Sequence, residues 1–132
     1  MRAASRADKT ILVIDDEPMI REAIRLALTR SGYQVLTAPD GRTGVELFRQ
    51  HGPQVDAVLL DLAMPEPDGA EVLTTLREIQ QDVRVILSSG QAETETLEHF
   101  GHLDLAGFLH KPFRPVELID TLDQVLGSNP AK

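Results

Sequence analysis

Four short apolar runs in this chain each end in residues that suit chemistry on a phosphoryl group. Two of the runs end in acids, one in a hydroxyl and one in a lysine. The residues are Asp15 and Asp16 after Ile11–Ile14, Asp61 after Val58–Leu60, Ser88 after Val83–Leu87, and Lys111 after Phe108–His110. Carboxylates, a hydroxyl and an ammonium group gathered at one point would bind a hard divalent cation and a phosphoryl group.

The aspartates Asp15, Asp16 and Asp61 would repel one another if the fold held them together, and one would take up a proton unless a cation intervened. Mg²⁺ (or Mn²⁺) removes that conflict, because it prefers oxygen ligands. One carboxylate could instead attack a phosphoryl group and form an aspartyl phosphate. Acids after a strand are often only a solvated turn or a helix cap. Glu17 could approach the metal region, although as a helix-opening acid it is favourable on dipole grounds alone. Their combination with a hydroxyl and a lysine at separate strand ends favours a site.

Strand-like and helix-like patterns alternate along the chain, which predicts βαβ units and a parallel sheet. In such sheets ligands bind outside the carboxyl ends of the strands, so the strand-end residues should meet at one edge. We expect strands at about residues 10–15, 33–37, 57–61, 83–88 and 106–110. We expect helices around residues 19–28, 45–48, 72–79 and 118–126, with Asp68 as the cap of the third, and a short helix with a weak pattern within 91–105.

The chain has 132 residues, which suits one domain with one core. We divide it into a flexible N-terminal segment 1–8, a domain 9–127 and a C-terminal tail 128–132. The formal net charge of −8 argues against a nucleic-acid surface, because phosphate contact needs clustered lysine and arginine. No apolar stretch is long enough to span a membrane, and the lack of cysteine suits a reducing compartment, so we expect a cytoplasmic location.

Motifs at these strand ends resemble the receiver domain of two-component response regulators. The matching segments are Ile11–Pro18, Leu60–Pro65, Asp68–Gly69 and Lys111–Phe113. The resemblance extends over residues 9–126 and implies a flavodoxin-like α/β fold, with five parallel strands in order 2-1-3-4-5 and helices on both faces. Segments 85–90 and 106–113 look more like receivers fused to hybrid histidine kinases. We therefore expect the receiver of such a kinase or a single-domain response regulator.

The resemblance implies a role for each acid. Asp61 matches the phosphoacceptor, which takes a phosphoryl group from the phosphohistidine of a sensor histidine kinase. Asp16 matches the direct Mg²⁺ ligand, Asp15 the acid that reaches the metal through water, and Ala63 the residue whose backbone carbonyl completes the ligands. A receiver of this kind catalyses its own phosphorylation and dephosphorylation without being a conventional enzyme, although its parent protein can be a histidine kinase.

The resemblance also implies a conformational switch. Ser88 matches the switch hydroxyl, and Lys111 matches the lysine that pairs with the phosphoryl group. Phe108 matches an aromatic residue that swings inward with the hydroxyl, although an aromatic in a strand is equally typical of the core. The Lys111–Pro112 peptide bond resembles one that is cis in this family. The signalling surface would be the fourth helix, the fifth strand and the fifth helix, where a second copy or a downstream protein could bind.

Two departures from the family pattern bear on behaviour. Glu66–Pro67 replaces the usual glycine–hydrophobic pair and should stiffen the loop above Asp61, since proline fixes φ. Ala63 and Gly90 stand where family members tune the access of water to the acyl phosphate, and neither side chain can orient a water. We therefore predict that autodephosphorylation is not fast, with a half-life of minutes or longer.

Two other functions share parts of this pattern. An aspartate-dependent phosphohydrolase uses the same nucleophile and metal, but it usually needs a general acid two residues after the nucleophile and a cap domain. Here Ala63 holds that position, and the chain leaves no room for a cap. A phosphorylation-independent interaction module of receiver shape would be indicated by the loss of key acids, and all of them are present.

Overall fold

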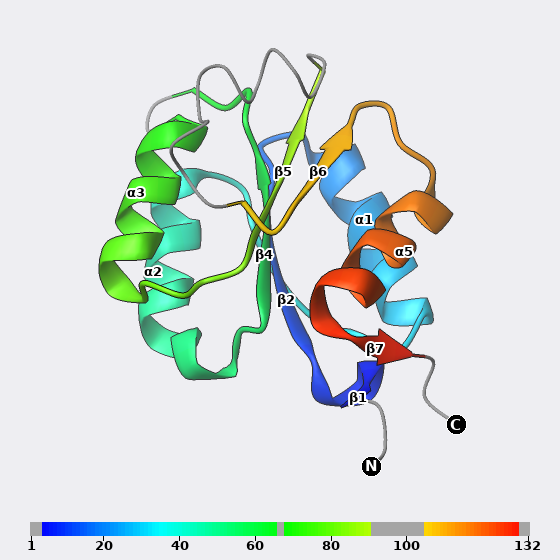
Figure 1. Ribbon diagram of the computed structural model, residues 1–132. Coiled ribbons are helices and arrows are strands. Elements are labelled where there is room, and N and C mark those ends of the chain that lie inside the picture. The colour runs from blue at the N-terminus through cyan, green and yellow to red at the C-terminus, as the bar shows by residue number, and fades with distance from the viewer. Residues whose placement is uncertain (1–3, 66–67, 91–104, 130–132) are drawn as a thin grey trace.

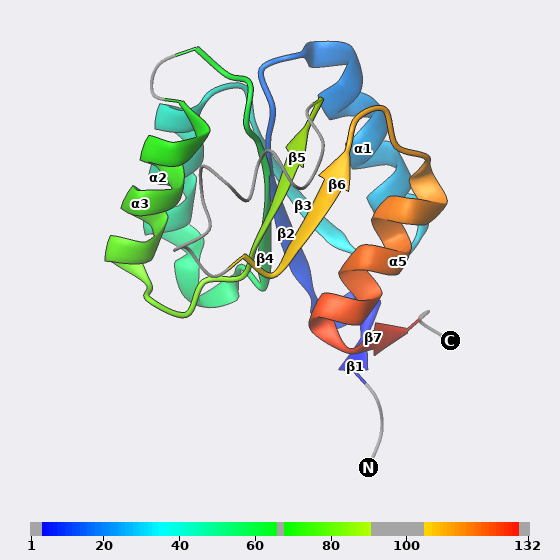
Figure 2. The ribbon, with the colours of Figure 1, turned by 45° about the horizontal axis from the view of Figure 1, so that its top comes forward.

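A five-stranded parallel sheet forms the centre of the computed structural model, with helices packed on both of its faces (Figures 1 and 2). The structure describes residues 4–65, 68–90 and 105–129. The strands of the sheet are β2 (Thr10–Ile14), β3 (Gln34–Ala38), β4 (Ala57–Asp61), β5 (Val85–Ser89) and β6 (Gly107–His110). Their order is β3-β2-β4-β5-β6, and every pairing is parallel. Counted along the chain, this is the predicted order 2-1-3-4-5, so the fold prediction is confirmed.

Within the described part of the chain, each face of the sheet carries a pair of helices. They are α2 (Gly41–His51) and α3 (Gly69–Ile79) on one face, and α1 (Pro18–Arg30) and α5 (Pro115–Leu126) on the other (Figure 1). Successive strand residues point to opposite faces. In β2, Leu12 and Ile14 therefore belong to the core beneath α2 and α3, whereas Ile11 and Val13 belong to the core beneath α1 and α5. Burial on both faces explains why the strands are uninterrupted apolar runs.

The helix ends follow local chemistry. Asp68 caps α3 as predicted, because its side chain accepts a hydrogen bond from the Glu71 amide at 3.0 Å and the Glu71 carboxylate accepts one from the Asp68 amide. Gly127 ends α5 with a φ of 62°, a left-handed conformation that glycine adopts at little cost. The helix predicted within 91–105 and the Glu66–Pro67 loop fall on residues 91–104 and 66–67, outside those described. None of the described helices is long and apolar enough to cross a membrane.

The two ends of the described chain pair with each other, within the N-terminal segment 1–8 and the C-terminal tail 128–132 that the sequence predicts. β1 (Ala4–Ser5) pairs in parallel with β7 (Ser128–Asn129), and a 3-10 turn, η1 (Arg6–Asp8), leads into β2. Two-residue strands are too short to show a hydrophobic period, so sequence patterns do not reveal them.

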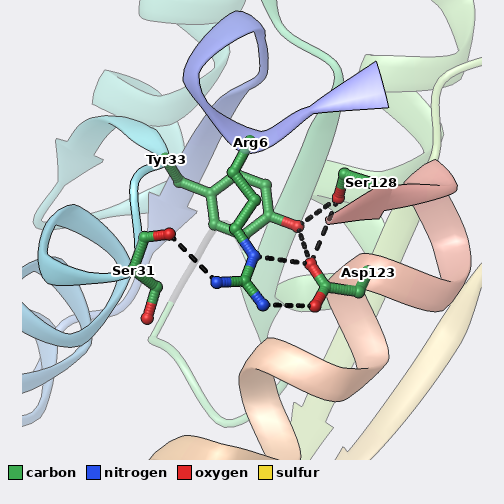
Figure 3. Close-up of polar contacts among 5 residues, drawn as sticks. All are labelled: Arg6, Ser31, Tyr33, Asp123 and Ser128. Atoms are coloured by element: carbon green, nitrogen blue, oxygen red, sulfur yellow. Dashed lines mark hydrogen bonds and ion pairs between the residues drawn. The ribbon is translucent and has the colours of Figure 1, made fainter. Parts of the chain in front are cut away.

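Five residues from separate parts of the chain meet around one carboxylate, and we call them the terminal clasp: Arg6, Ser31, Tyr33, Asp123 and Ser128 (Figure 3). Asp123 accepts hydrogen bonds from Arg6 at 3.0 and 2.6 Å, from the Tyr33 hydroxyl at 2.6 Å and from the Ser128 hydroxyl at 3.2 Å. Arg6 also donates to the carbonyl of Ser31 at 3.1 Å. The clasp therefore fixes the N-terminal segment against α5 and against the turn that follows α1.

The clasp shifts the pKa values of its members. Burial raises the pKa of Tyr33 to about 12, and the hydrogen bond to Asp123 acts in the same direction. Burial alone would raise the pKa of Asp123, but the hydrogen bonds from Arg6 and Tyr33 and the charge of Arg6 outweigh it, so this pKa lies below its usual value. Near neutral pH the clasp thus holds a charged carboxylate and a neutral phenol.

Candidate functional site

The carboxyl ends of four strands place the predicted site residues along one edge of the sheet. Asp61 is the last residue of β4, and Ser88 lies beside it in the parallel register of β5. Asp15 and Asp16 follow β2, which pairs with the other side of β4. Lys111 follows β6, the neighbour of β5. The parallel arrangement thereby brings to one edge residues that lie far apart in the sequence.

Four carboxylates converge at this edge, those of Asp15, Asp16, Glu17 and Asp61. One carboxylate oxygen from each lies within 4.8 Å of those of the others. Asp15 and Asp61 are buried, with 2% and 1% of their surface exposed, whereas Asp16 is half-buried and Glu17 is exposed. Convergent oxygen ligands with a buried inner side and an open outer side suit a hard divalent cation that keeps some of its waters, so these residues fit Mg²⁺.

Glu17 is the member of this cluster that sequence patterns did not assign to the site. It occupies the N-cap of α1, where the helix dipole favours an acid, and that alone accounts for a glutamate. In the structure its carboxylate joins the other acids and lies 3.9 Å from the Lys111 ammonium group. The only sequence feature that could have assigned Glu17 to the site is its position directly after Asp15 and Asp16. That position does not distinguish a metal ligand from a helix cap.

The Lys111 ammonium group lies between two buried acids. Its Nζ is 3.3 Å from Asp15 Oδ2 and 3.3 Å from Asp61 Oδ1. Burial lowers the pKa of Lys111, but the charges of Asp15 and Asp61 and their hydrogen bonds outweigh burial, and the pKa is raised above its ordinary value. The Lys111 amide donates to the carbonyl of Ser89 at 2.7 Å, and the Lys111–Pro112 bond is cis as expected. The end of β6 and the local backbone thus position the positively charged Lys111 ammonium group beside Asp61.

Backbone groups orient the two buried carboxylates. Asp15 Oδ1 accepts a hydrogen bond from the Glu17 amide at 2.9 Å, while the Asp15 carbonyl accepts one from the Arg21 side chain at 2.8 Å. Asp61 Oδ1 accepts a hydrogen bond from the Ala63 amide at 3.1 Å. These contacts hold both carboxylates in fixed directions at the edge of the sheet. The metal-binding role of the Ala63 carbonyl stays a prediction.

The two predicted switch residues lie on neighbouring strands next to the acids. Ser88 is buried, with 1% of its surface exposed, and its carbonyl accepts a hydrogen bond from the Leu62 amide at 2.9 Å. Phe108 is half-buried on β6, opposite Leu87 of β5, and it packs against the core beneath α2 and α3. Phe108 therefore contributes to the core, and its movement on activation stays a prediction, as does the role of the Ser88 hydroxyl.

Known proteins resemble this chain along most of its length. A family model described as "Response regulator receiver domain" matches residues 11–123. The chain is 35% identical over 117 residues to the sensor kinase CckA of Brucella abortus, covering 89% of this chain and 12% of that protein. It is 35% identical over 111 residues to the response regulator GtcR of Aneurinibacillus migulanus, covering 84% of this chain and 45% of that protein.

Solved structures agree with this similarity. The chain resembles the crystal structure of a response regulator receiver domain protein from Clostridium thermocellum, with a TM-score of 0.84 and 27% identity. The match covers 90% of this chain and 94% of that one. In contrast, the chain spans less than half the length of the two relatives CckA and GtcR.

Proposed function

Because this chain belongs to the response regulator receiver family, we propose that Asp61 accepts a phosphoryl group from the phosphohistidine of a sensor histidine kinase. One observation supports this proposal most strongly: buried Asp61 shares the Lys111 ammonium group with Asp15 at the carboxyl edge of the sheet. A buried carboxylate can act as a nucleophile toward phosphorus. The fixed ammonium group beside it supplies a positive charge for the incoming phosphoryl oxygens.

In the proposed reaction, an oxygen of the Asp61 carboxylate attacks phosphorus while the phosphorus–nitrogen bond of phosphohistidine breaks. The imidazole leaves with the electron pair of that bond and is protonated from solvent. Lys111 turns from the Asp61 carboxylate to a phosphoryl oxygen and offsets the added negative charge, while the Ser88 hydroxyl donates a hydrogen bond to another. Hydrolysis of the aspartyl phosphate returns the domain to its starting state.

We assign the divalent cation, Mg²⁺ or Mn²⁺, to Asp15, Asp16, Asp61 and the backbone carbonyl of Ala63. When bound, the ion neutralises charge on the transferring phosphoryl group. The convergence of carboxylate oxygens within 4.8 Å supports this assignment. Exposed Glu17 adds negative charge at the rim, which attracts cations toward the inner acids.

Phosphorylation would bias a two-state surface of the domain. In this proposal Ser88 moves toward the phosphoryl group, Phe108 swings inward, and the surface of β6 and α5 changes together with the predicted fourth helix. A downstream protein or a second copy would bind there. We assign the domain to a hybrid sensor histidine kinase or to a single-domain response regulator in the cytoplasm. Similarity to the sensor kinase CckA supports the first of these parents.

Intact-mass measurement after incubation with acetyl phosphate tests the proposed function. We expect one phosphoryl adduct on the wild-type chain in the presence of Mg²⁺, and none in EDTA or on the Asp61→Asn variant. Asp82→Asn serves as the matched control, because it makes the same chemical change at an exposed turn residue that precedes β5, at the opposite end of that strand from Ser88.

A phosphate-release assay, together with the adduct measurement, separates the two alternatives. An aspartate-dependent phosphohydrolase would release phosphate from a small phosphomonoester in repeated turnovers, which a receiver does not do. A phosphorylation-independent interaction module would show no adduct with acetyl phosphate or with a phosphorylated kinase. Either result would contradict the proposed function.

A further inference from the structure

Arg21 is a charged residue of α1 whose position the proposed function does not explain. Its backbone amide donates to the carbonyl of Glu17 at 2.9 Å, so Arg21 lies in the first turns of the helix. A positive charge near the N-terminus of a helix is unfavourable, because that end already carries a partial positive charge. Within the described residues Arg21 forms no ion pair, and the neighbouring Glu22 pairs with Arg25 instead. Neither the helix nor an ion pair therefore accounts for an arginine at this place.

The Arg21 side chain reaches back past the start of α1 to the loop that carries two of the site's acids. Side chains of a helix lean toward its N-terminus, which directs the guanidinium group toward this loop. Its Nη1 donates to the backbone carbonyl of Asp15 at 2.8 Å. A hydrogen bond from a charged donor is stronger than one between neutral groups, and Arg21 is half-buried, which limits competition from water. Arg21 therefore holds the backbone of the loop.

The two acids of this loop are held in different ways. The Asp15 carboxylate has contacts of its own, with the Glu17 amide at 2.9 Å and with Lys111 Nζ at 3.3 Å. The half-buried Asp16 carboxylate, in contrast, accepts no hydrogen bond and forms no ion pair within the part of the chain that the structure describes. The direction of the Asp16 side chain is therefore set by the backbone that carries it.

The carbonyl that Arg21 binds belongs to the peptide group that joins Asp15 to Asp16. A peptide group is planar, so a hydrogen bond that fixes its oxygen also fixes the plane that contains the amide nitrogen of Asp16. The Asp15 amide supplies a second fixed point, because it donates to the carbonyl of Ala38 at 3.2 Å. The Arg21 contact thus bears directly on the orientation of Asp16.

We propose that Arg21 is a positioning residue of the divalent-cation site, which orients Asp16 through the Asp15–Asp16 peptide group and so raises the affinity for Mg²⁺. This inference rests on the proposed assignment of Mg²⁺ to Asp15, Asp16 and Asp61. Groups that orient metal ligands from behind commonly contribute about ten- to a hundredfold to metal affinity. In this proposal Arg21 touches neither the ion nor the phosphoryl group, and it acts only through Asp16.

The sign of a change in affinity distinguishes positioning from a simple effect of charge. Arg21 carries a positive charge near four converging carboxylates, and that charge by itself repels a cation. If charge alone mattered, removing the guanidinium group would tighten Mg²⁺ binding. If positioning matters, its removal frees the peptide group to rotate, Asp16 is no longer held toward the other acids, and Mg²⁺ binding weakens.

Isothermal titration calorimetry of the unphosphorylated chain measures the Mg²⁺ affinity without any phosphoryl donor. We expect Arg21→Met, which keeps the apolar stem and loses the donor, to weaken Mg²⁺ binding about tenfold. Arg21→Lys keeps a charged donor on a shorter side chain, so it should bind Mg²⁺ only about threefold more weakly than the wild type. Far-ultraviolet circular dichroism confirms that each chain is folded, and Arg21→Lys carries the test if Arg21→Met unfolds.

Arg25→Met is the matched control. It removes the same charge from the same helix, but from a side chain that pairs with Glu22 and does not contact the loop. Its Mg²⁺ affinity should stay within about twofold of the wild type, since an exposed ion pair contributes little.

The dependence of phosphorylation on Mg²⁺ concentration is a second measurement. With acetyl phosphate, Arg21→Met should need about tenfold more Mg²⁺ to reach half of its maximal rate, while the maximal rate at saturating Mg²⁺ stays within about threefold of the wild type. A lower maximal rate with an unchanged Mg²⁺ requirement would contradict a role in positioning the metal ligand.

The calorimetric outcomes separate this inference from the proposed function. Mg²⁺ affinity in Arg21→Met equal to or tighter than that of the wild type would overturn the positioning role and leave the proposed function standing. A wild type that binds no Mg²⁺ would overturn the cation assignment, and this inference with it. Weaker Mg²⁺ binding in Arg21→Met, together with a wild type that accepts no phosphoryl group, would support the positioning role and contradict the proposed function.

Discussion

Lys111 lies between two buried carboxylates, and the charge balance of the site depends on it. Four acids converge there, and Lys111 contacts three of them within 3.9 Å. Unpaired buried charges are costly, so removing the lysine would leave Asp15 and Asp61 facing each other without a cation. The residues that we propose for the chemistry are therefore also residues on which local stability depends.

Lys111→Met should lower the free energy of unfolding by about 2 kcal/mol in EDTA, less than the loss of a fully buried partner because the site is open on one side. Urea denaturation measures this change. Adding Mg²⁺ should restore more stability to the variant than to the wild type, since the ion replaces the missing positive charge. Lys9→Met, which removes a half-buried lysine at 3.9 Å from Asp56, is the matched control. Equal stability of Lys111→Met and Lys9→Met would refute this account of the charge balance.

The lifetime of the aspartyl phosphate depends on whether a side chain can orient water near Asp61. Ala63 is exposed, and a Cβ atom added to Gly90 would meet no other atom of the described residues within 4 Å, so a longer side chain fits at either place. We predict a half-life of minutes or longer for the wild type, and an increase in the dephosphorylation rate of about tenfold for Ala63→Asn, which can position a water. Decay of the phosphorylated mass with time measures both. A wild-type half-life of seconds would contradict the prediction.

At the level of secondary structure, the loop that follows Asp61 is held by a close approach to α3. A Cβ atom on Gly69 would lie 2.9 Å from the Cα of Leu62 and 2.9 Å from its Cδ1. Leu62 directly follows Asp61, the proposed phosphoacceptor, and its backbone cannot give way without moving Asp61. The first residue of α3 is thus coupled to the geometry of the site.

Gly69→Ala should lower the free energy of unfolding by about 1–3 kcal/mol, as other additions to a packed interior do. It should also slow phosphorylation by acetyl phosphate about tenfold, because a small displacement of a reacting group is costly. Samples quenched at a series of times and analysed by intact mass give the phosphorylation rate. Gly52→Ala is the control, since its nearest contact would be an ordinary 3.8 Å from Gln80. If both alanine variants react at the wild-type rate, α3 does not position Asp61.

Sequence patterns predicted the elements that place the site, because uninterrupted apolar runs such as Ile11–Ile14 are distinctive for strands buried on both faces. They predicted strand ends to within a residue or two: the second strand was expected at 33–37 and occupies Gln34–Ala38. Tyr33 lies outside that strand, where its hydroxyl binds Asp123. Such a contact spans 90 positions and has no local signature, so periodicity could not reveal it.

At the level of the whole molecule, the terminal clasp joins the first described residues to the last helix. Arg6 and Asp123 lie 117 positions apart, and nothing in the composition of either neighbourhood marks them as partners. The site was predictable because its residues sit at strand ends, where topology brings them together by rule. The terminal clasp was not predictable from the sequence, because it depends on the path of two short terminal segments rather than on a repeating pattern.

The clasp should make stability depend on pH at both extremes. Tyr33 is the single tyrosine of the chain, and its pKa in the folded state is about 12, above its ordinary value of 10.0. A raised pKa means that the stabilisation is full below pH 10 and is lost as the pH rises toward 12. The lowered pKa of Asp123 means that its stabilisation is present above its ordinary pKa of 3.8 and is lost as the pH falls through the lower folded value.

Ultraviolet absorbance titration of the single tyrosine reports directly on the clasp. We expect a midpoint near 12 in the native wild type. In Asp123→Asn the midpoint should move part of the way toward 10, because burial, the larger cause, remains. Asp82→Asn should leave it unchanged. A native midpoint at the ordinary value would show that Tyr33 is not held in the clasp.

The central claim is that Asp61 carries the phosphoryl group, and chemical mapping of the modified residue tests it most directly. Borohydride reduces an aspartyl phosphate to the side chain of homoserine, which marks the residue permanently. After acetyl phosphate, Mg²⁺ and borohydride, peptide sequencing by mass spectrometry should find this mark at Asp61 alone. A mark at Asp15, Asp16 or Glu17, or a phosphorylated chain without any reducible aspartate, would contradict the assignment of Asp61 as the phosphoacceptor.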